Sequence, residues 1–324
     1  MGLCNYVEAT GRGPFESVSI RIGPSGKIIV GTGATAQGQG VATMIAQVVA
    51  EVLTVAPETI EVTCGDTLAT PAGLGAYASR QAVTAGNAAH AAALLVAEKA
   101  RAATAAMLEA SVADLELRDG SVQVRGVPGH ARTLTEIARA LAGAPGFALP
   151  GNLPPGLAAA SDFMTSGLTY TNGAHVAEVE VDIETGEVKI LRFTVVHDCG
   201  RVINPMVVDG QVIGGVAHGV GNALYEQLMF DDNAQPLTTN FGEYLLPMAT
   251  DVPRVDLVHL QTPSPLNPLG VKGAGEGGTI SAIGAIISAV ENALEPFGVH
   301  IAEAPITPMR IVELLRGHSK GRTA

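Results

Sequence analysis

The strongest constraint on the fold is a glycine-rich stretch that stands directly before a helical pattern. Residues 270–280, GVKGAGEGGTI, contain five glycines, one lysine and one glutamate. Apolar residues then recur at helical spacing, at Ile280, Ile283, Ile287, Val290 and Leu294. Because glycine lets the backbone approach a neighbour closely, the pattern predicts a tight loop leading into a helix, with Glu276 at the junction. Either this is a turn with an incidental acid, or the backbone meets a ligand there and Glu276 does chemistry.

A second glycine-rich turn precedes another predicted helix. In AQGQGVATMIAQV (36–48), the free backbone N–H groups and the dipole at the helix start favour an anion such as a cofactor phosphate. The residues concerned are Gly38, Gln39, Gly40 and Thr43. The alternative is a plain connection. The stretch lacks GxxxxGK[ST] and does not match GxGxxG followed by an acid, which disfavours a nicotinamide site.

Two further polar groups stand at or within predicted helices. YASRQAVTAG (77–86) offers Ser79, Arg80 and Thr84 at a helix start, which indicates a second anion site or a simple cap with a surface arginine. Gln211 lies on a helix otherwise made of Val, Ile and Gly. Its amide either reads the edge of a heterocycle or faces solvent.

Glu276 is expected to sit in a buried, apolar setting. A helix N-terminus favours the ionised carboxylate, whereas desolvation raises its affinity for a proton. A general base at neutral pH needs these effects to balance. Lys272 is placed to hold a phosphate or to offset that charge. We interpret the sequence 197–199 (HDC) as structural, because adjacent strand residues point to opposite faces, and His90 and His218 as packed.

Composition excludes several classes of protein. The 19 Lys and Arg against 31 Asp and Glu give a net charge of −12, which disfavours nucleic acid or an anionic membrane as a partner. The three cysteines are far apart, so a disulfide framework or a zinc site is not expected. A cytoplasmic location is expected. No leader is recognisable, and no apolar run approaches the roughly 20 residues of a membrane span.

The clearest break in composition is the Pro- and Gly-rich stretch 142–162, which predicts two lobes, residues 1–150 and 151–324. Hairpins are expected over 17–33, 114–126 and 174–198, and further strands over 58–67 and 254–261. Helices are expected after the two glycine-rich turns, over 87–108, after Pro205 and after Pro308.

Six segments, taken together and in order, resemble one family. They are MGLCNYVEATGRG (1–13), AQGQGVATMIAQVVAEVL (36–53), GDTLATPAGLGAYASRQAVTAG (65–86), HDCGRVINPMVVDGQVIGGVAHGVGNALYEQ (197–227), NFGEYLLP (240–247) and GVKGAGEGG (270–278). They follow one another as in the molybdenum hydroxylases, the family of xanthine dehydrogenase, aldehyde oxidase and aerobic carbon monoxide dehydrogenase. The resemblance implies an α+β fold, a two-lobed molybdopterin-binding domain with mixed sheets and packed helices.

Only the second molybdopterin-binding domain of that family's large subunit is matched. Met1 and the tail favour a naturally split subunit, similar to the medium molybdopterin subunit of nicotinate dehydrogenase, over a truncated chain. The resemblance then implies a partner subunit that carries the first half, together with an iron–sulfur subunit and an FAD subunit.

The resemblance also implies residue roles. The pyranopterin phosphate, or a cytosine dinucleotide extension, would be bound by Gly38, Gln39, Gly40, Thr43, Ser79, Arg80 and Thr84. Gln211 would hydrogen-bond the pterin, and Lys272, Gly273 and Gly275 would shape the loop that meets the cofactor. Glu276 matches the catalytic glutamate, and no side chain of this chain would ligate the metal. The cofactor implied is molybdenum–molybdopterin.

The activity implied is hydroxylation of an electron-poor carbon, with water as the oxygen source and Glu276 as the base. An N-heteroaromatic such as a purine or pyridine is the first substrate class, and an aldehyde or carbon monoxide is the alternative. An alternative of another class is a non-catalytic subunit that binds the pterin or assists assembly.

Overall fold

The structure is a computed structural model that describes residues 1–68, 70 and 72–321. Its contacts divide the chain into two compact units. Unit 1 comprises Met1–Ala9, Tyr170–Thr262 and Ala274–Ala324, and unit 2 comprises Thr10–Thr169 and Pro263–Gly273. Along the chain, the backbone therefore passes from one unit to the other four times. These units are discontinuous, unlike the predicted lobes 1–150 and 151–324, because strands pair with neighbours that are distant in sequence.

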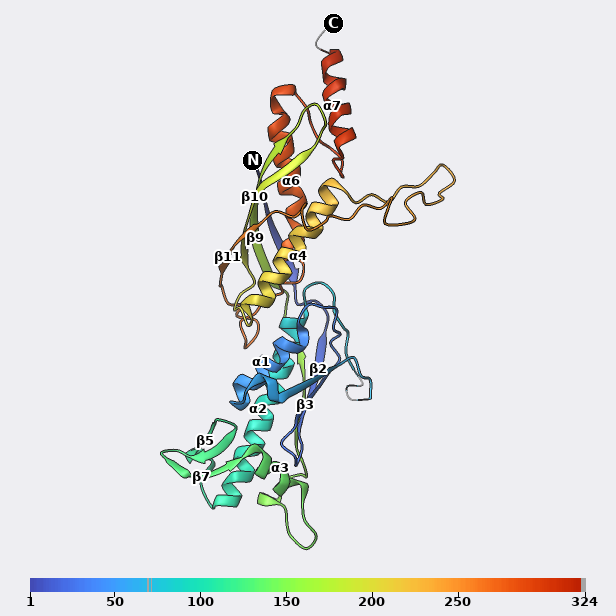
Figure 1. The fold of residues 1–324 in the computed structure, drawn as a ribbon. Coiled ribbons are helices and arrows are strands. Elements are labelled where there is room, and N and C mark those ends of the chain that lie inside the picture. The colour runs from blue at the N-terminus through green and yellow to red at the C-terminus, as the bar shows by residue number, and fades with distance from the viewer. Residues whose placement is uncertain (69, 71, 322–324) are drawn as a thin grey trace. The chain divides into compact units, whose positions relative to one another are not determined.

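Unit 2 is built on a four-stranded mixed sheet with the order β4-β3-β2-β8. The strands are β2 (Phe15–Ile22), β3 (Ile28–Thr32), β4 (Ile60–Cys64) and β8 (Leu157–Met164). Strand β2 is antiparallel to β3 and β8, whereas β3 and β4 are parallel. The expected hairpin 17–33 is thereby confirmed. Helices α1 (Val41–Leu53) and α2 (Gln81–Leu108) pack on each other, and α2 also packs on β2 and β8 (Figure 1).

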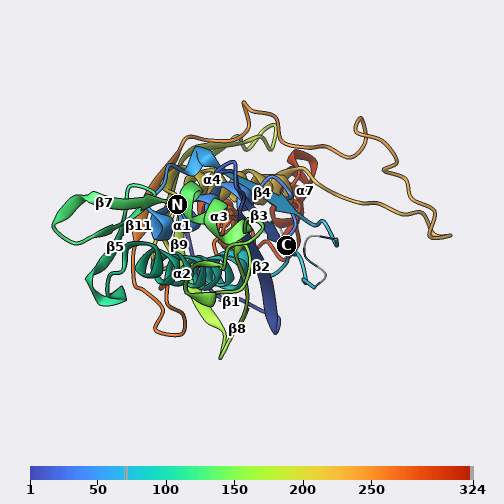
Figure 2. The same cartoon turned by 90° about the horizontal axis from the view of Figure 1, so that it is seen from below.

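A small antiparallel sheet completes unit 2. It contains β5 (Leu115–Arg118), β6 (Ser121–Val124) and β7 (Val127–Thr133), and it lies beside α2 (Figure 2). Helix α3 (Leu134–Ala142) follows, and its start is fixed by a capping box between Thr133 and Glu136. The buried face of α2 is largely alanine, which allows close packing with few aromatic residues. The short 3₁₀ helices of this unit are η1 (Pro57–Thr59), η2 (Val112–Asp114) and η3 (Pro150–Asn152).

Unit 1 is built on a second mixed sheet, with the order β1-β9-β10-β11. Its strands are β1 (Gly2–Thr10), β9 (Thr169–Val181), β10 (Val188–Asp198) and β11 (Val255–Leu260). Strands β9 and β10 form the expected hairpin, and β11 is parallel to β10. The helices are α4 (Pro205–Leu224), α5 (Gly277–Ile280), α6 (Ala282–Leu294) and α7 (Pro308–Gly321), with the 3₁₀ turn η4 (Glu295–Phe297). Both units confirm the α+β fold class.

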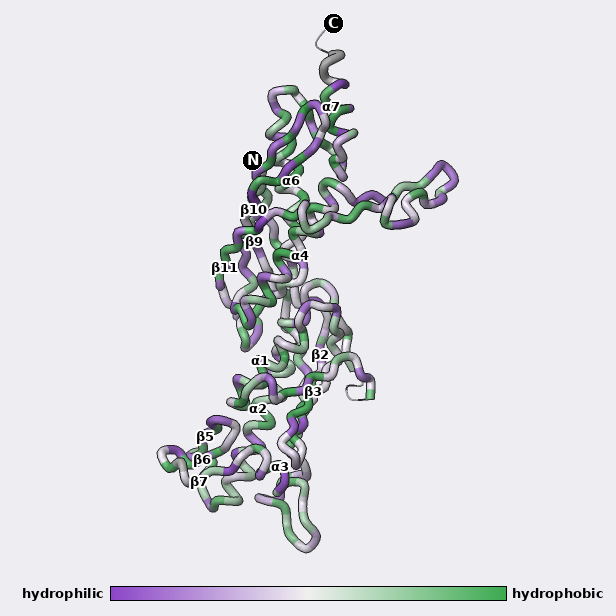
Figure 3. The backbone as a smooth tube through the Cα atoms, viewed as in Figure 1, coloured by the Kyte–Doolittle hydropathy of each residue, from purple (hydrophilic) through white to green (hydrophobic). Residues whose placement is uncertain are grey.

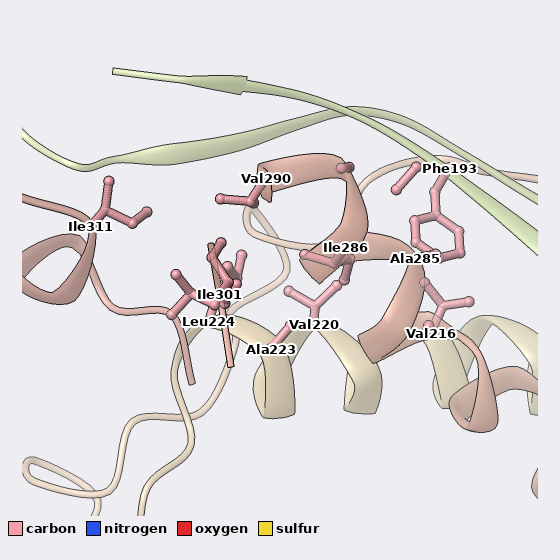
Figure 4. Close-up of a cluster of buried hydrophobic side chains, with 14 of the residues drawn as sticks. Phe193, Val216, Val220, Ala223, Leu224, Ala285, Ile286, Val290, Ile301 and Ile311 are labelled. Carbon is pink, nitrogen blue, oxygen red and sulfur yellow. The ribbon is translucent and has the colours of Figure 1, made fainter. Parts of the chain in front are cut away.

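The core of unit 1 lies between this sheet and helices α4 and α6. Phe193 of β10 is fully buried with Val216 and Val220 of α4 and with Ile286 of α6 (Figure 4). Two glycines of α4 allow close approach, because a Cβ on Gly215 would lie 2.7 Å from the Cα of Gly278 in α5, and one on Gly219 would lie 3.4 Å from the Cα of Ala282 in α6. Gly215 and Gly219 therefore serve packing, and the glycines of α4 do not interrupt the helix.

One helical stretch of the described residues, Gly277–Phe297, is long and apolar enough to cross a membrane by length and composition alone. It spans 21 residues, so the expectation that no apolar run approaches this length is wrong. Half of its most apolar 18-residue stretch is buried within the structure. Ala285, Ile286 and Val290 of this stretch belong to the core of unit 1. Core packing accounts for its apolar character.

A long segment between α4 and β11, residues 228–252, runs outward from unit 1 in two views (Figures 1 and 2). We call this segment the arm. Apolar and polar stretches alternate along it (Figure 3). Its exposed large apolar side chains are Leu228, Met229, Phe230, Leu237, Phe241, Leu245, Leu246 and Met248. The arm is tied to the end of α4, because the Tyr244 hydroxyl donates a hydrogen bond to Glu226 Oε2 at 2.7 Å.

Candidate functional site

The first predicted anion site lies at the start of α1, in unit 2. Gly38 and Gly40 have φ values of 94° and 76°, in the left-handed region, and α1 begins at Val41. No side chain of the described residues caps this helix start, and its first turn carries no acid. The first-turn N–H groups consequently lack a side-chain acceptor. Thr43 is exposed in the same turn, so this helix start is uncapped and partly accessible, as the predicted anion site requires.

Gln39 connects this helix start to the next one. Its Nε2 donates to Gln81 Oε1 at 2.6 Å and to Thr35 O at 2.9 Å, and its Oε1 accepts from the backbone N–H of Gln37. Gln81 is the first residue of α2 and itself donates to Thr35 O. The structure therefore brings the two predicted anion sites together within unit 2. Gln81 was missed by the sequence analysis, although its amide at a helix start was the available signal.

Arg80 differs from the prediction of a surface or anion-binding arginine. Its side chain is fully buried and forms an ion pair with Glu16 of β2. The guanidinium also donates to three carbonyls, Arg12 O at 2.5 Å, Phe15 O at 2.6 Å and Gly75 O at 2.7 Å. Its N–H groups are thus committed within unit 2, and Arg80 holds the loop that precedes α2. Glu16 lies 64 residues away in the sequence, which is why local spacing did not reveal the pair.

The other residues of this helix start have separate partners. The Thr84 hydroxyl donates to Arg80 O at 3.0 Å, one helical turn earlier, and Thr84 is fully buried. Ser79 lies just before α2 with a φ of 48° and is half-buried. Of the three predicted residues, Ser79 is the only one that is not buried, and its carbonyl accepts a hydrogen bond from Gly11 N–H.

The segment 263–273 returns to unit 2 and ends against Ser79. The N–H of Gly273 donates to Thr10 Oγ1 at 3.0 Å, and a Cβ on Gly273 would lie 2.6 Å from the Cβ of Ser79. Glycine is therefore required there by close approach. Asn267 fixes the segment by bonding Val271 and the buried Asn87 of α2, and these two asparagines were not predicted. Lys272 is half-buried beside Gly273.

In unit 1, the structure places the predicted Glu276 at the start of α5, where it is the N-cap residue. Glu276 and Gly275 are exposed in this chain, so the expectation that Glu276 is buried is wrong. The buried carboxylates include Glu8 and Glu16 instead. The physical reason is that the glycines after Glu276 turn inward, whereas the carboxylate stands on the outer side of the helix start.

The two glycines that follow Glu276 are packed on both sides. A Cβ on Gly277 would lie 2.6 Å from both His197 Cε1 and the Tyr6 hydroxyl, and one on Gly278 would lie 2.8 Å from Val212 Cα. Val212 directly follows Gln211, a half-buried residue of α4. Unit 1 therefore brings the predicted Gln211 turn and the Glu276 loop together. The prediction that glycine here permits close approach of the backbone is confirmed.

Beneath the Glu276 loop lies a cluster of aromatic and imidazole rings. The Tyr6 hydroxyl and His197 Nδ1 are 2.6 Å apart in a buried hydrogen bond. Burial raises the pKa of Tyr6 above its usual value, and the nearby Glu8 adds to the effect. Burial, and then the neighbouring His197, lowers the pKa of His175 to about 4. Both Tyr6 and His175 are therefore uncharged near neutral pH.

Residues 197–199 make contacts within the protein, which agrees with our interpretation of this sequence as structural. Asp198 Oδ1 accepts from the N–H groups of Gly200 and Thr262, and Cys199 is buried. His218 is exposed, so the expectation that it is packed is wrong, and His90 is half-buried. Within the described residues, no group of three or more His, Cys, Asp or Glu side chains is placed to hold a metal ion.

Comparison with known proteins gives consistent matches. The pattern of the molybdopterin cofactor-binding domain matches residues 1–253. The 6-hydroxypseudooxynicotine dehydrogenase complex subunit gamma of Paenarthrobacter nicotinovorans is 42% identical over 321 residues, which is 99% of this chain and 40% of that subunit. The carbon monoxide dehydrogenase large chain of Hydrogenophaga pseudoflava is 36% identical over 98% of this chain and 41% of its own length.

A solved structure agrees with these relatives. The quinoline 2-oxidoreductase of Pseudomonas putida 86 superposes with a TM-score of 0.87 at 38% identity, covering 97% of this chain and 41% of its own. The chain thus spans about 40% of the length of the curated relatives that it matches.

Proposed function

Because the chain belongs to the molybdopterin-binding subunits of the molybdenum hydroxylase family, we propose that it is a catalytic part of a hetero-oligomeric hydroxylase. The substrate is an N-heteroaromatic compound with an electron-poor carbon, and water supplies the oxygen. The observation that carries the proposal is the position of Glu276. It lies at the start of α5, directly before two glycines that pack against neighbouring residues. The packed backbone fixes the position of the Glu276 Cα, while the residue itself is exposed to solvent.

The residues of unit 2 fit the phosphate end of the cofactor. The first turns of α1 and α2 carry no acidic residue, and no side chain of the described part of the chain caps them. Such helix starts favour a phosphate group over a neutral one. Because Gln39 links the two starts, they suit two neighbouring phosphates, and this supports the cytosine dinucleotide form of molybdopterin.

Each predicted residue then has a proposed task. Gly38, Gly40 and Thr43 present the α1 start, and Ser79, Lys272 and Gly273 form the adjoining surface. Gln39, Arg80 and Thr84 hold that surface in shape through their contacts within the protein. In unit 1, Gln211 hydrogen-bonds the pterin, and Gly275 leaves room for the cofactor beside Glu276.

When bound, the molybdenum–molybdopterin group supplies the two-electron redox chemistry of the hydroxylation. The task of Glu276 is to accept a proton at a carboxylate oxygen as the oxygen nucleophile forms. A carboxylate exposed to water is a weak base near pH 7, and loss of water around it raises its proton affinity. We therefore propose that a partner subunit covers Glu276 and excludes water from it.

The names of two relatives support the substrate class. The quinoline enzyme and the 6-hydroxypseudooxynicotine enzyme both bear the names of N-heteroaromatic compounds. Carbon monoxide is the second candidate, because a carbon monoxide dehydrogenase large chain matches nearly as well. An aldehyde belongs to the same alternative. A non-catalytic pterin-binding or assembly subunit is the candidate of another class.

The proposed partner subunits are based on how much of its relatives' length this chain covers. Since this is about 40%, we propose that another subunit carries the first half of the molybdopterin site. An iron–sulfur subunit and an FAD subunit would carry the electrons away. None of the three cysteines, Cys4, Cys64 and Cys199, forms a disulfide, which supports the proposal of a reducing, cytoplasmic setting.

The test is Glu276→Gln in the tagged complex, purified from the native host. Loss of a general base lowers turnover by roughly 10²–10⁴-fold, and molybdenum content is expected to stay at the wild-type level. Glu184→Gln, an exposed carboxylate in the turn between β9 and β10, is the control and should leave turnover unchanged. Retained turnover in Glu276→Gln would refute its role as base. Wild-type complex that binds molybdenum but oxidises no heteroaromatic, aldehyde or carbon monoxide would favour the non-catalytic subunit.

A further inference from the structure

We propose that Tyr6 and His197 are positioning residues that fix Glu276 through the backbone of the Glu276 loop. The inference rests on the proposed function, because it takes Glu276 to be the base. The two residues come from β1 and β10 and are 191 positions apart. Both are buried, with 6% and 1% of their surface exposed. Their hydrogen bond, from the phenol oxygen to the imidazole Nδ1, measures 2.6 Å.

This pair is in direct contact with the loop. Gly277 is the residue after Glu276, and a Cβ there would lie 2.6 Å from both the Tyr6 hydroxyl and His197 Cε1. On the other side, Gly278 packs against the backbone of Val212 in α4. The first turn of α5 is therefore held between the Tyr6–His197 pair and α4. Because Glu276 begins this turn, any displacement of the pair moves the origin of its carboxylate.

The pair belongs to a longer row of rings within unit 1. The ring of His197 meets that of His259 edge to face at 6.0 Å, and His259 Nε2 lies 2.6 Å from Asp209 Oδ1. Asp209 is on α4, two residues before Gln211. The row thus joins the loop that carries Glu276 to the helix turn that carries Gln211, so it can hold both in one geometry.

The other neighbours of the pair are also defined. His175 meets Tyr6 edge to face at 5.8 Å, and His175 in turn meets Phe193 of the core. Glu8, Asp198 and Cys199 are the remaining titratable groups near Tyr6. The support beneath Glu276 therefore consists of directional contacts, the Tyr6–His197 hydrogen bond and the edge-to-face packing of the rings. Such directional contacts fix the position of the loop backbone.

The experiment uses Tyr6→Phe in the tagged native complex, which keeps the ring and removes the hydroxyl. Two quantities are measured, amide hydrogen exchange over residues 274–281 and the kinetic constants kcat and KM. We expect faster exchange at Gly277 and Gly278. A lost hydrogen bond is worth about 1 kcal/mol, so kcat should fall roughly 5-fold, whereas KM and molybdenum content stay unchanged. Tyr170→Phe, an exposed tyrosine on β9, is the matched control and should change neither quantity.

A second pair of variants tests the hydrogen bond itself. In His197→Asn the amide oxygen stands near the place of Nδ1 and can accept from the Tyr6 hydroxyl, whereas His197→Leu offers no acceptor. The exchange rate at the loop should be closer to wild type in His197→Asn than in His197→Leu.

Unchanged exchange at the loop in Tyr6→Phe would overturn the inference, even with Glu276 confirmed as the base. A fall in kcat accompanied by loss of molybdenum or a rise in KM would also overturn it, because it would mean a general structural role. Conversely, full turnover in Glu276→Gln removes the proposed base, while the exchange data still decide whether the pair holds the loop.

Discussion

The two glycine-rich loops of this chain rest on different supports. In unit 2, the loop before α2 is held by a buried ion pair, Arg80 with Glu16, whose guanidinium also binds three carbonyls. In unit 1, the Glu276 loop rests on the buried, hydrogen-bonded Tyr6–His197 pair, and His175 packs edge to face against Tyr6. The comparison teaches that one chain holds two similar loops by different means, a buried ion pair in unit 2 and a hydrogen-bonded pair of rings in unit 1.

The glycines before α1 and before α5 also differ in what requires them. Gly38 is needed for its left-handed backbone, and among the described residues nothing lies within 4 Å of the position of its missing Cβ. Gly277 is needed because its backbone touches the ring pair beneath it. One sequence signature, glycine before a helix, thus has a conformational cause in unit 2 and a packing cause in unit 1.

The largest effect is expected from Arg80→Met, which breaks the charged support. Removing one partner of a buried ion pair leaves an uncompensated charge and costs about 3–5 kcal/mol. The free energy of unfolding, measured with urea, should fall by that amount. The control is Lys27→Met, which removes the ion pair with Glu61 at two half-exposed side chains and should cost less than about 1 kcal/mol. Equal costs for the two variants would contradict a special role of the buried pair.

The burial of His175 predicts that the free energy of unfolding falls in acid. Its folded pKa of about 4 lies below the ordinary value of 6.5, so the unfolded chain binds the extra proton first as pH falls. The stability contribution is therefore fully present above pH 6.5 and is lost between pH 6.5 and about 4, up to roughly 3 kcal/mol. His175→Phe should flatten this part of the curve of unfolding free energy against pH. The exposed His218→Gln is the control, and the same flattening there would argue against burial as the cause.

The smallest expected difference in unfolding free energy is between the alanine variants of Gly277 and Gly38. Gly277→Ala overpacks the ring pair and should cost about 1–3 kcal/mol of unfolding free energy. Gly38→Ala meets no neighbour and should cost about 1 kcal/mol, through its left-handed φ alone. Urea unfolding of the two variants measures both costs. A larger loss in Gly38→Ala than in Gly277→Ala would reverse the assignment of causes.

Local pattern in the sequence predicted the elements well. The hairpin over β2 and β3, the hairpin over β9 and β10, and the helix starting near Pro205 all follow from alternation, turn residues and helical spacing. The position of Glu276 at a loop-to-helix junction followed from the same kind of signal. These features depend on residues that are close together in the sequence, which is why they could be read from it.

The supports beneath the loops could not be predicted in this way. Glu16 is 64 residues from Arg80, and Tyr6 is 191 residues from His197. Each pair forms because strands from remote segments enter one sheet or because a helix packs on a sheet, and periodicity carries no information about such pairing. The exposure of Glu276 was missed for a similar reason, since burial depends on what covers a loop and not on how apolar its sequence is.

The four passages of the backbone between the units carry a consequence for synthesis on the ribosome. Strand β1 is translated first, but its sheet neighbour β9 begins at Thr169, and segment 263–273 of unit 2 follows later still. Neither unit can complete its contacts until most of the polypeptide has left the exit tunnel. Long-range pairing of this kind slows folding and leaves apolar strands uncovered in the meantime, so the nascent chain is a natural client for chaperones.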